Sequence, residues 1–258
     1  MGTIRIKDAE EIERMRLAGS LAGAVLAELG RLIKPGLSTA ELNAAGEKFI
    51  RGKGGEPVFI GYRGYRHATC ISINQEVVHG IPGDKVLKEG DIVSVDVGVK
   101  KDGYIGDCAE TFPVGRVSGK AAKLLRVGRQ ALKAGIRQAR AGKHLGDISY
   151  AVQATAEKSG FSVVRDLYGH GVGRELHEDP LIPNYGKPGE GPELREGMVL
   201  AIEPMLNVGG YEIRTLPDGW TVVTRDGQLS CHFEHTVLIT AVEPEILTRL
   251  RRAGMVEK

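Results

Sequence analysis

Acidic and histidine side chains interrupt the apolar stretches of this sequence at five positions. Asp96 and Asp107 lie in SVDVGVKKDGYIGD, and His170 lies between two glycines in YGHGVGRELHEDP. Glu203 follows the apolar run MVLAI, and Glu234 lies within HFEHTVLIT. Four carboxylates that are buried together repel one another and lose their hydration, so the fold must supply positive charge. The sequence therefore predicts a fold that gathers these groups around cations, for which two divalent ions are the natural choice.

A salt bridge is the structural alternative for the two glutamates. Both lie in strands that read as buried, and a buried carboxylate needs a partner. Arg214 and Arg225 are the candidate partners in that case. The combination of two glutamates, two aspartates and a glycine-flanked histidine favours the metal interpretation.

The composition describes an ordinary globular chain. The 258 residues are 41% hydrophobic and 26% charged, and Lys plus Arg exceed Asp plus Glu by only two (35 against 33). This balance argues against a dedicated nucleic-acid binder. Three widely spaced cysteines do not suggest a disulfide framework, and no window carries the roughly 18 apolar residues that span a membrane. We therefore expect a cytoplasmic protein without a membrane segment.

Caps and periodicity predict helices and strands in a repeated order. Asp8 and Glu11 form a capping pattern before a helical stripe that ends at Pro35 and Gly36. Ser118 caps a second long helix. The expected order is a helix from 8 to about 34, a helix from 38 to about 51, strands over about 58–114, a helix from 118 to 140, a helix from 146 to about 158, and strands from 162 onward.

This order suggests an internal duplication. Gly36 and Gly54 recur as Gly142 and Gly160 at a constant offset of 106. We predict one α+β domain over residues 1–258 with pseudo-repeats of about 8–115 and 118–245, each a helix-helix-sheet half. A pocket is then expected at the seam between the halves.

The two aspartates belong to a predicted β-hairpin. Valines alternate from Val93 to Val99, which leaves Asp96 on the opposite face. If Lys101 and Asp102 form the turn, Asp96 and Asp107 stand directly opposite each other; if Asp102 and Gly103 form it, the two acids are diagonal neighbours. Either register keeps both carboxylates on one face, where a cation would remove their repulsion. Gly98 and Gly106 are expected to leave room beside the acids.

The segment GHGVG surrounds His170 with glycines. Its spacing does not match a dinucleotide fingerprint, and we expect the glycines to let the backbone approach a ligand closely. His177 follows seven residues later and is near enough to serve the same pocket.

Oxygen-rich ligation with one imidazole suits Mn²⁺, Fe²⁺, Co²⁺ or Zn²⁺. Two such ions lower the pKa of a water and polarise a carbonyl, while a neighbouring carboxylate moves the proton. The residues alone indicate a two-metal hydrolase and leave peptides and phosphate esters both open as substrates.

The ordered set of five ligands resembles that of the methionine aminopeptidases with the pita-bread fold. ATCISINQEVVHGIP, the hairpin, GHGVGRELHEDP, GMVLAIEPM and FEHTVLIT all resemble that family, and the length is similar to its short bacterial type I members. The resemblance implies a pita-bread α+β fold with a central antiparallel sheet. It also implies a cytoplasmic hydrolase that removes the initiator methionine of nascent proteins and prefers a small second residue.

The resemblance assigns roles residue by residue. Asp96 would chelate one metal, Asp107 would bridge both, and His170, Glu203 and Glu234 would complete the coordination. Glu203 would also shuttle a proton, and His79 and His177 would contact substrate and stabilise the tetrahedral intermediate. The resemblance further implies a methionine pocket of Tyr62, Tyr65, Cys70 and Trp220, and a Na⁺ or K⁺ site near Asn74 and Ser230. A monomer is expected, and docking on the ribosome is compatible with an enzyme of nascent chains.

Two places depart from the family pattern. Leu176 stands where an aromatic residue is usual, and Cys231-His232 replaces a small residue followed by Gln. The alternatives are a proline-handling peptidase of the same fold, which is usually longer, a pita-bread binding protein without catalysis, and a two-metal phosphoesterase. A binding protein without catalysis should lack at least one of the five ligands. A phosphoesterase should have further basic groups in these motifs besides Arg174.

Overall fold

The computed structural model describes residues 3–249 and has four α-helices in the expected order. Asp8 and Ser38 both form capping boxes, with Glu11 and Glu41 as their partners, so these two helix starts are confirmed. Ser118 accepts a hydrogen bond from the backbone of Ala121 and begins the third helix as expected. The helices are α1 (Ala9–Leu32), α2 (Thr39–Gly52), α3 (Gly119–Gln138) and α4 (Leu145–Lys158).

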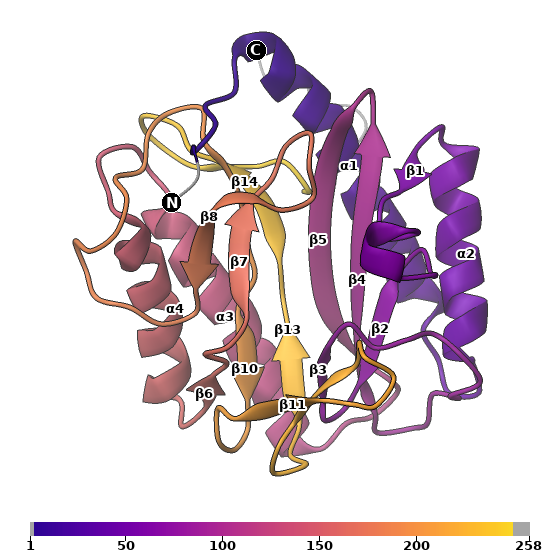
Figure 1. The fold of residues 1–258 in the computed structure, drawn as a ribbon. Coiled ribbons are helices and arrows are strands. Elements are labelled where there is room, and N and C mark those ends of the chain that lie inside the picture. The colour runs from indigo at the N-terminus through magenta and orange to yellow at the C-terminus, as the bar shows by residue number, and fades with distance from the viewer. Residues whose placement is uncertain (1–2, 250–258) are drawn as a thin grey trace.

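The strands form antiparallel ladders that are distributed over two halves of the molecule (Figure 1). In the first half β4 pairs with β1, β2 and β5, and in the second β9 lies between β7 and β14. The strands are β1 (Glu56–Pro57), β2 (Cys70–Ile73), β3 (Glu76–Val78), β4 (Ile92–Lys101), β5 (Tyr104–Pro113), β6 (Ser162–Val163), β7 (Tyr168–Gly171), β8 (Glu178–Pro183), β9 (Val199–Ile202), β10 (Met205–Asn207), β11 (Ile213–Thr215), β12 (Val222–Thr224), β13 (Ser230–His232), β14 (His235–Leu238) and β15 (Glu245–Ile246). A short 3₁₀ turn, η1 (Tyr62–Gly64), precedes β2.

The two halves meet along β5 and the segment 232–236. Ala109 and Glu234 exchange backbone hydrogen bonds of 2.8 and 3.4 Å. On either side of this pair, threonine hydroxyls make the hydrogen bonds instead of backbone groups. The Thr111 hydroxyl donates to the carbonyl of His232 and accepts from its N–H. The Thr236 hydroxyl does the same with the carbonyl and N–H of Asp107. Figure 1 shows β5 beside β13 and β14, with α1 and α2 on one half and α3 and α4 on the other. This junction places Asp107 and Glu234 side by side.

The hairpin takes the second of its two expected registers. Lys101 pairs with Tyr104, so Asp102 and Gly103 form the turn, and Asp107 stands opposite Gly98. Both turn residues have positive φ, 51° and 82°, as a two-residue turn of this type requires. Asp96 and Asp107 are therefore diagonal neighbours on one face, and the valine face packs into the core beneath α1 and α2.

The prediction that Gly98 and Gly106 leave room beside the acids is wrong. A Cβ on Gly98 would come within 2.4 Å of Val58 and 2.7 Å of Phe59. A Cβ on Gly106 would come within 2.5 Å of the backbone of Gly19 in α1. The two glycines serve packing instead. Gly98 leaves space for the side chains of Val58 and Phe59, and Gly106 lets α1 contact β5 directly.

No helix within residues 3–249 is long and apolar enough to cross a membrane. Cys70, Cys108 and Cys231 are all buried and free. Burial raises the pKa of each of these thiols, which agrees with a packing role for Cys231.

Candidate metal centre and substrate pocket

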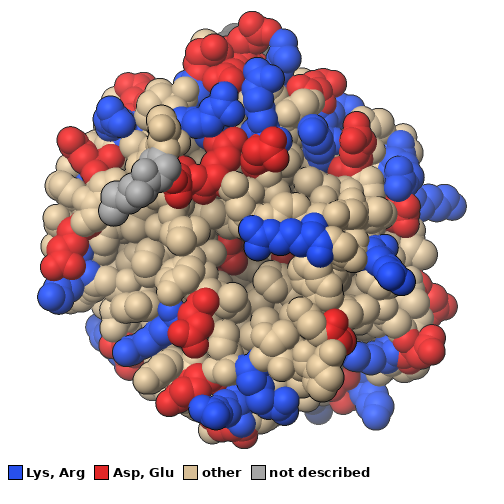
Figure 2. Space-filling view, viewed as in Figure 1, with Lys and Arg blue, Asp and Glu red and all other residues tan. Residues whose placement is uncertain are grey.

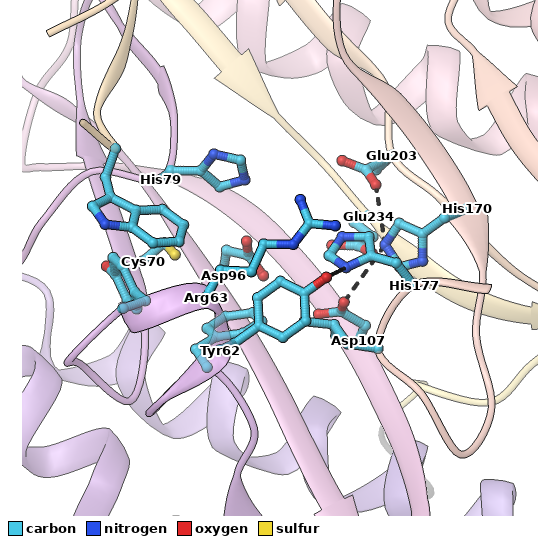
Figure 3. A pocket seen from close by; sticks show the side chains of 14 residues that line it. Tyr62, Arg63, Cys70, His79, Asp96, Asp107, His170, His177, Glu203 and Glu234 are labelled. Atoms are coloured by element: carbon cyan, nitrogen blue, oxygen red, sulfur yellow. Dashed lines mark hydrogen bonds and ion pairs between the residues drawn. The ribbon is translucent and has the colours of Figure 1, made fainter.

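The five predicted ligands converge on one cavity between the two halves. Asp96 and Asp107 come from β4 and β5, and His170 comes from β7 (Figure 3). Glu203 directly follows β9, and Glu234 lies between β13 and β14. In the space-filling view, acidic atoms are visible within a hollow at the middle of this face (Figure 2). Residues up to 138 positions apart in sequence thus form one group because the two halves meet at β5.

The distances between the ligand atoms are those expected of a metal site, in which the ligands face a common point. Nε2 of His170 lies 3.5 Å from Oε1 of Glu203 and 3.9 Å from Oδ2 of Asp107. One ligand atom each of Asp107, His170 and Glu234 lies within 4.8 Å of the others. Two ligands on opposite sides of an ion at about 2.1 Å are about 4.2 Å apart. A small contraction would therefore bring all three into contact with one ion.

The carboxylates have no compensating charge from the protein. Oδ1 of Asp96, Oδ1 of Asp107 and Oε1 of Glu234 are buried and have no hydrogen-bond partner within the described part of the chain. No lysine or arginine of residues 3–249 pairs with Glu203 or Glu234, and the two arginines considered as partners, Arg214 and Arg225, line a different groove. The salt-bridge alternative is therefore wrong.

Burial raises the pKa values of all four carboxyl groups. The pKa of Asp107 rises to about 7 because burial penalises the charged form. Burial and then the nearby Asp107 raise the pKa values of Asp96, Glu203 and Glu234 well above their usual range. Without cations the cluster would hold protons near neutral pH, and a divalent ion would replace those protons.

The histidines of the site are neutral near pH 7. Burial lowers the pKa of His170 to about 4, and Nδ1 of its ring lies 2.9 Å from the carbonyl oxygen of Gly171. A neutral ring donates from Nδ1 to that carbonyl, so Nε2 presents a free lone pair to the carboxylates, as a metal ligand must. Burial also lowers the pKa values of His177 and His232, each to about 3.

An apolar wall closes the other side of the cavity. Phe59, Tyr65, Cys70, Leu176 and Trp220 line it together with the charged groups. The rings of Tyr65 and Trp220 meet edge to face at 5.0 Å. The cavity holds about 150 Å³, roughly five times the volume of a water molecule in the liquid, so it admits one side chain rather than a folded peptide.

Two further histidines lie at the cavity. Nδ1 of His177 lies 2.6 Å from the hydroxyl of Tyr62, and the His177 ring lies 4.2 Å from that of His170. His79 has a positive φ of 58°, and its ring faces that of Trp220 at 6.3 Å. The structure therefore brings every predicted catalytic, metal and pocket residue to one cavity.

The remaining two candidates lie elsewhere. Asn74 and Ser230 do not line the cavity; the Ser230 backbone N–H donates to the carbonyl of Asn74 at 2.9 Å. The Asn74 side chain bonds Asp91 and the backbone of Ile92. The two residues are neighbours, and a Na⁺ or K⁺ ion beside them stays a prediction.

The comparison with known proteins agrees with this geometry. The family described as "Metallopeptidase family M24" matches this chain over residues 13–241. The chain belongs to metallopeptidase family M24. A divalent-metal site is thus expected of the family, and the orphaned carboxylate oxygens of this chain fit one.

Several relatives that match almost the whole chain are named methionine aminopeptidase. Methionine aminopeptidase 1 of Bacillus subtilis is 51% identical, over 95% of this chain and 98% of its own length. The crystal structure of a methionine aminopeptidase from Thermotoga maritima is 49% identical, with a TM-score of 0.94 over 96% of this chain and 100% of that one. A prolidase from Pyrococcus furiosus is 26% identical with a TM-score of 0.77, and the match covers 66% of the prolidase. The predicted α+β pita-bread fold is confirmed by these structures.

Sequence reasoning did not select three residues that line the cavity of this M24 chain. Phe59 resembles any core residue in sequence, and Leu176 was noted only as a departure from the pattern. Arg63 lies in η1 with a positive φ of 48°, and Figure 3 shows its side chain extending across the cavity. Only the positive charge of Arg63 within GYRGY could have drawn attention to it.

The glycines of the histidine loop serve strand packing rather than ligand approach, so that prediction is wrong. A Cβ on Gly169 would lie 2.5 Å from the carbonyl oxygen of Ala201 and 3.3 Å from Cγ of Glu203. A Cβ on Gly171 would lie 2.3 Å from the carbonyl oxygen of Asp179. The missing side chains let β7 contact β9 and β8 closely, which holds His170 beside Glu203.

We expect Gly169→Ala to lower the free energy of unfolding by about 1–3 kcal/mol, because the added methyl group overpacks a rigid backbone contact. It should also lower activity, since the methyl group displaces Glu203. Urea unfolding followed by circular dichroism measures the first effect. Gly119→Ala is the matched control: its Cβ meets nothing within 4 Å at the start of α3, so stability should be unchanged or higher. Equal stability of the two variants would contradict this account of β7.

Proposed function

We propose that this chain is a dinuclear metallo-aminopeptidase that removes the N-terminal methionine of polypeptides whose second residue is small. One observation carries the proposal: a cluster of four buried carboxylates and one imidazole lies at one side of a small, mainly apolar pocket. The near-complete match to proteins named methionine aminopeptidase supports it. The two-metal phosphoesterase loses support, because Arg63 is the one lysine or arginine among the cavity-lining residues of 3–249.

The cluster is proposed to hold two divalent ions, with Co²⁺, Mn²⁺, Fe²⁺ and Zn²⁺ as candidates. Asp96, Asp107 and Glu234 would hold one ion, and Asp107, His170, Glu203 and Glu234 the other. Such ions lower the pKa of a water and polarise the scissile carbonyl. The protein contributes the ligand set and the apolar wall of Phe59, Tyr65, Cys70, Leu176 and Trp220 on the other side of the cavity.

Glu203 is the proposed proton carrier. Its carboxylate lies at the edge of the cluster, and its side chain keeps 13% of its exposure, more than those of Asp107, His170 and Glu234. It is thus positioned to take a proton from the attacking water and to give it to the leaving amine. In the metal-free protein, burial and two neighbouring aspartates raise its pKa.

His79 and His177 are the proposed donors to the substrate carbonyl oxygen. When the Tyr62 hydroxyl donates to Nδ1 of His177, the proton of the neutral ring lies on Nε2. A neutral donor that is fixed before the reaction can stabilise the developing oxyanion without being reoriented. Tyr62, Tyr65, Cys70 and Trp220, with Phe59 and Leu176, would contact the methionine side chain.

Peptides of the form Met-X-Ser provide the direct test. We expect cleavage of the first bond when X is Gly, Ala or Ser, and at least about 100-fold lower kcat/KM when X is Leu or Glu, because a cavity of about 150 Å³ leaves little space beyond the methionine side chain. Mass spectrometry of the products, with each of the four metals added separately, measures this.

Two control substrates make the peptide test specific. Acetyl-Met-Ala-Ser has no free amine and should remain intact. Ala-Pro-Ser has no N-terminal methionine and should also remain intact, whereas a peptidase that cleaves only before proline would cleave it and leave Met-Ala-Ser intact. A preference for Ala-Pro or for phosphate esters over Met-Ala-Ser would refute the proposed function.

Other features remain proposals of the same kind. We propose a single catalytic domain with pseudo-repeats of about 8–115 and 118–245, a Na⁺ or K⁺ ion near Asn74 and Ser230, and a monomeric cytoplasmic enzyme that acts on nascent chains. Docking on the ribosome would fit that role. Size-exclusion chromatography with light scattering tests the monomer, and co-sedimentation with ribosomes tests the docking.

A further inference from the structure

His232 is a buried histidine that the proposed chemistry leaves unused. It ends β13 and keeps 2% of its exposure. Its Nε2 is fully buried and has no hydrogen-bond partner among residues 3–249. An unpaired polar nitrogen in the interior costs free energy, so its position calls for an explanation.

The nearest charged atoms to this nitrogen belong to the two glutamates of the cluster. Nε2 of His232 lies 3.5 Å from Oε2 of Glu203 and 4.0 Å from Oε2 of Glu234. Oε1 of Glu203, in contrast, lies 3.5 Å from Nε2 of His170. The Glu203 carboxylate therefore lies between two imidazoles, one near each oxygen.

The backbone of His232 is fixed on both sides. Thr111 donates from its hydroxyl to the carbonyl of His232 at 2.8 Å and accepts from its N–H at 2.9 Å. Because the Thr111 proton is used, the Ser94 hydroxyl, 2.8 Å away, must donate to Thr111. On its other side His232 pairs with Met205, two residues after Glu203. The ring can therefore change its distance to Glu203 by only a small amount.

From this geometry we infer that His232 is a positioning residue for Glu203: its Nε2–H donates to Oε2 and fixes the orientation of the carboxylate that carries the proton. His232 does not line the cavity, so it does not touch substrate. All five proposed ligands line that cavity, so the absence of His232 from it favours an indirect role over catalysis or ligation. The inference rests on the proposed function, in which Glu203 moves the proton.

The variants His232→Leu and His232→Gln separate positioning from packing. Leucine fills the space and cannot donate, whereas the glutamine amide can donate over a similar reach. We expect His232→Leu to lower kcat for Met-Ala-Ser by about 10–100-fold. KM should change by less than about threefold, because the interaction concerns the reaction rather than binding. His232→Gln should retain kcat to within about threefold.

Metal stoichiometry and the spectrum of the Co²⁺-loaded protein provide readouts besides activity. Both should be the same in His232→Leu and in the unmodified protein, since no ligand is lost. His235→Leu is the matched control: it removes a half-buried imidazole that contacts Thr248 instead of Glu203, and kcat should be unaffected. Wild-type kcat in His232→Leu, the loss of one metal equivalent in that variant, or an equal loss of kcat in the Leu and Gln variants would each overturn the inference.

A measurement on the unmodified protein keeps the test independent of whether the variants fold. Long-range ¹H–¹⁵N NMR of the Zn²⁺-loaded protein reports the tautomer of each of its seven histidines. We expect His232 to be protonated at Nε2; an unprotonated or metal-bound Nε2 would overturn the proposal. If the unmodified protein cleaves no Met-X-Ser peptide, the proposed function fails, while the tautomer of His232 can still be determined.

Discussion

Replacing Glu203 by Gln is expected to lower kcat for Met-Ala-Ser by about 100- to 10,000-fold, because the amide cannot take the proton from water or return it to the leaving amine. The variant should remain folded. In the metal-free protein, the change removes one of four mutually repelling carboxylates whose pKa values are raised by burial. Its melting temperature near pH 8 should therefore equal or exceed that of the unmodified protein.

Stopped assays at several metal concentrations separate lost chemistry from lost metal. Glu110→Gln is the matched control, since Glu110 lies on β5 but pairs with Arg129 at 2.8 Å and keeps 37% exposure of its side chain. That surface pair contributes little, so the control should keep its activity and stability. If Glu203→Gln retained more than about a tenth of kcat with a full complement of metal, another group would have to move the proton.

Local sequence signals were sufficient to predict the elements that bring the site together. The capping pair of Asp8 and Glu11 predicted the start of α1, because a cap is read from residues three positions apart. The alternation of valines in β4 determined which face carries Asp96. The register stayed open by one residue, and the positive φ angles at Asp102 and Gly103 decide it.

Features that depend on contacts between distant segments could not be predicted from the sequence. Gly106 shows no sign in sequence that its missing side chain admits Gly19 of α1, nor Gly169 that it admits the backbone of Ala201. The contact between His232 and Glu203 depends on the pairing of β13 with β10, which places His232 opposite Met205, two residues after Glu203. The ligand set was predictable for a different reason: isolated charges in apolar runs are visible in sequence whatever the fold.

Removing the metal is expected to abolish activity and to make stability depend on pH in a definite direction. We expect chelation to lower activity by more than about 100-fold, and added Mn²⁺ or Co²⁺ to restore it. In the metal-free protein the pKa of Asp107 is raised by burial from 3.8 to about 7. A carboxyl group with a raised pKa binds its proton more tightly when folded, so its stabilising contribution is full below about pH 4 and is lost as the pH rises through 7.

The melting temperature of the metal-free protein should therefore fall between about pH 5 and pH 8. The other three carboxyl groups extend this fall to higher pH, because burial raises their pKa values further. Divalent ions at about 100 times their Kd would stabilise the fold by about 2.7 kcal/mol, which is roughly 5–10 °C for a chain of this size. The shift should grow as the pH rises, because binding displaces protons from the cluster.

Differential scanning fluorimetry from pH 5.5 to 8.5, with and without metal, measures these shifts. Calorimetric titration in buffers of different ionisation enthalpy counts the protons released. Asp107→Asn is the control variant, since it removes a carboxylate that lies 3.9 Å from Nε2 of His170 and should reduce both the number of protons released and the metal-induced shift. Binding without proton release, or a metal-free melting temperature that rises over this pH range, would mean that the cluster is already ionised. The carboxylates would then need a compensating charge other than the metal, and none of the lysines or arginines in residues 3–249 pairs with Asp96, Asp107, Glu203 or Glu234.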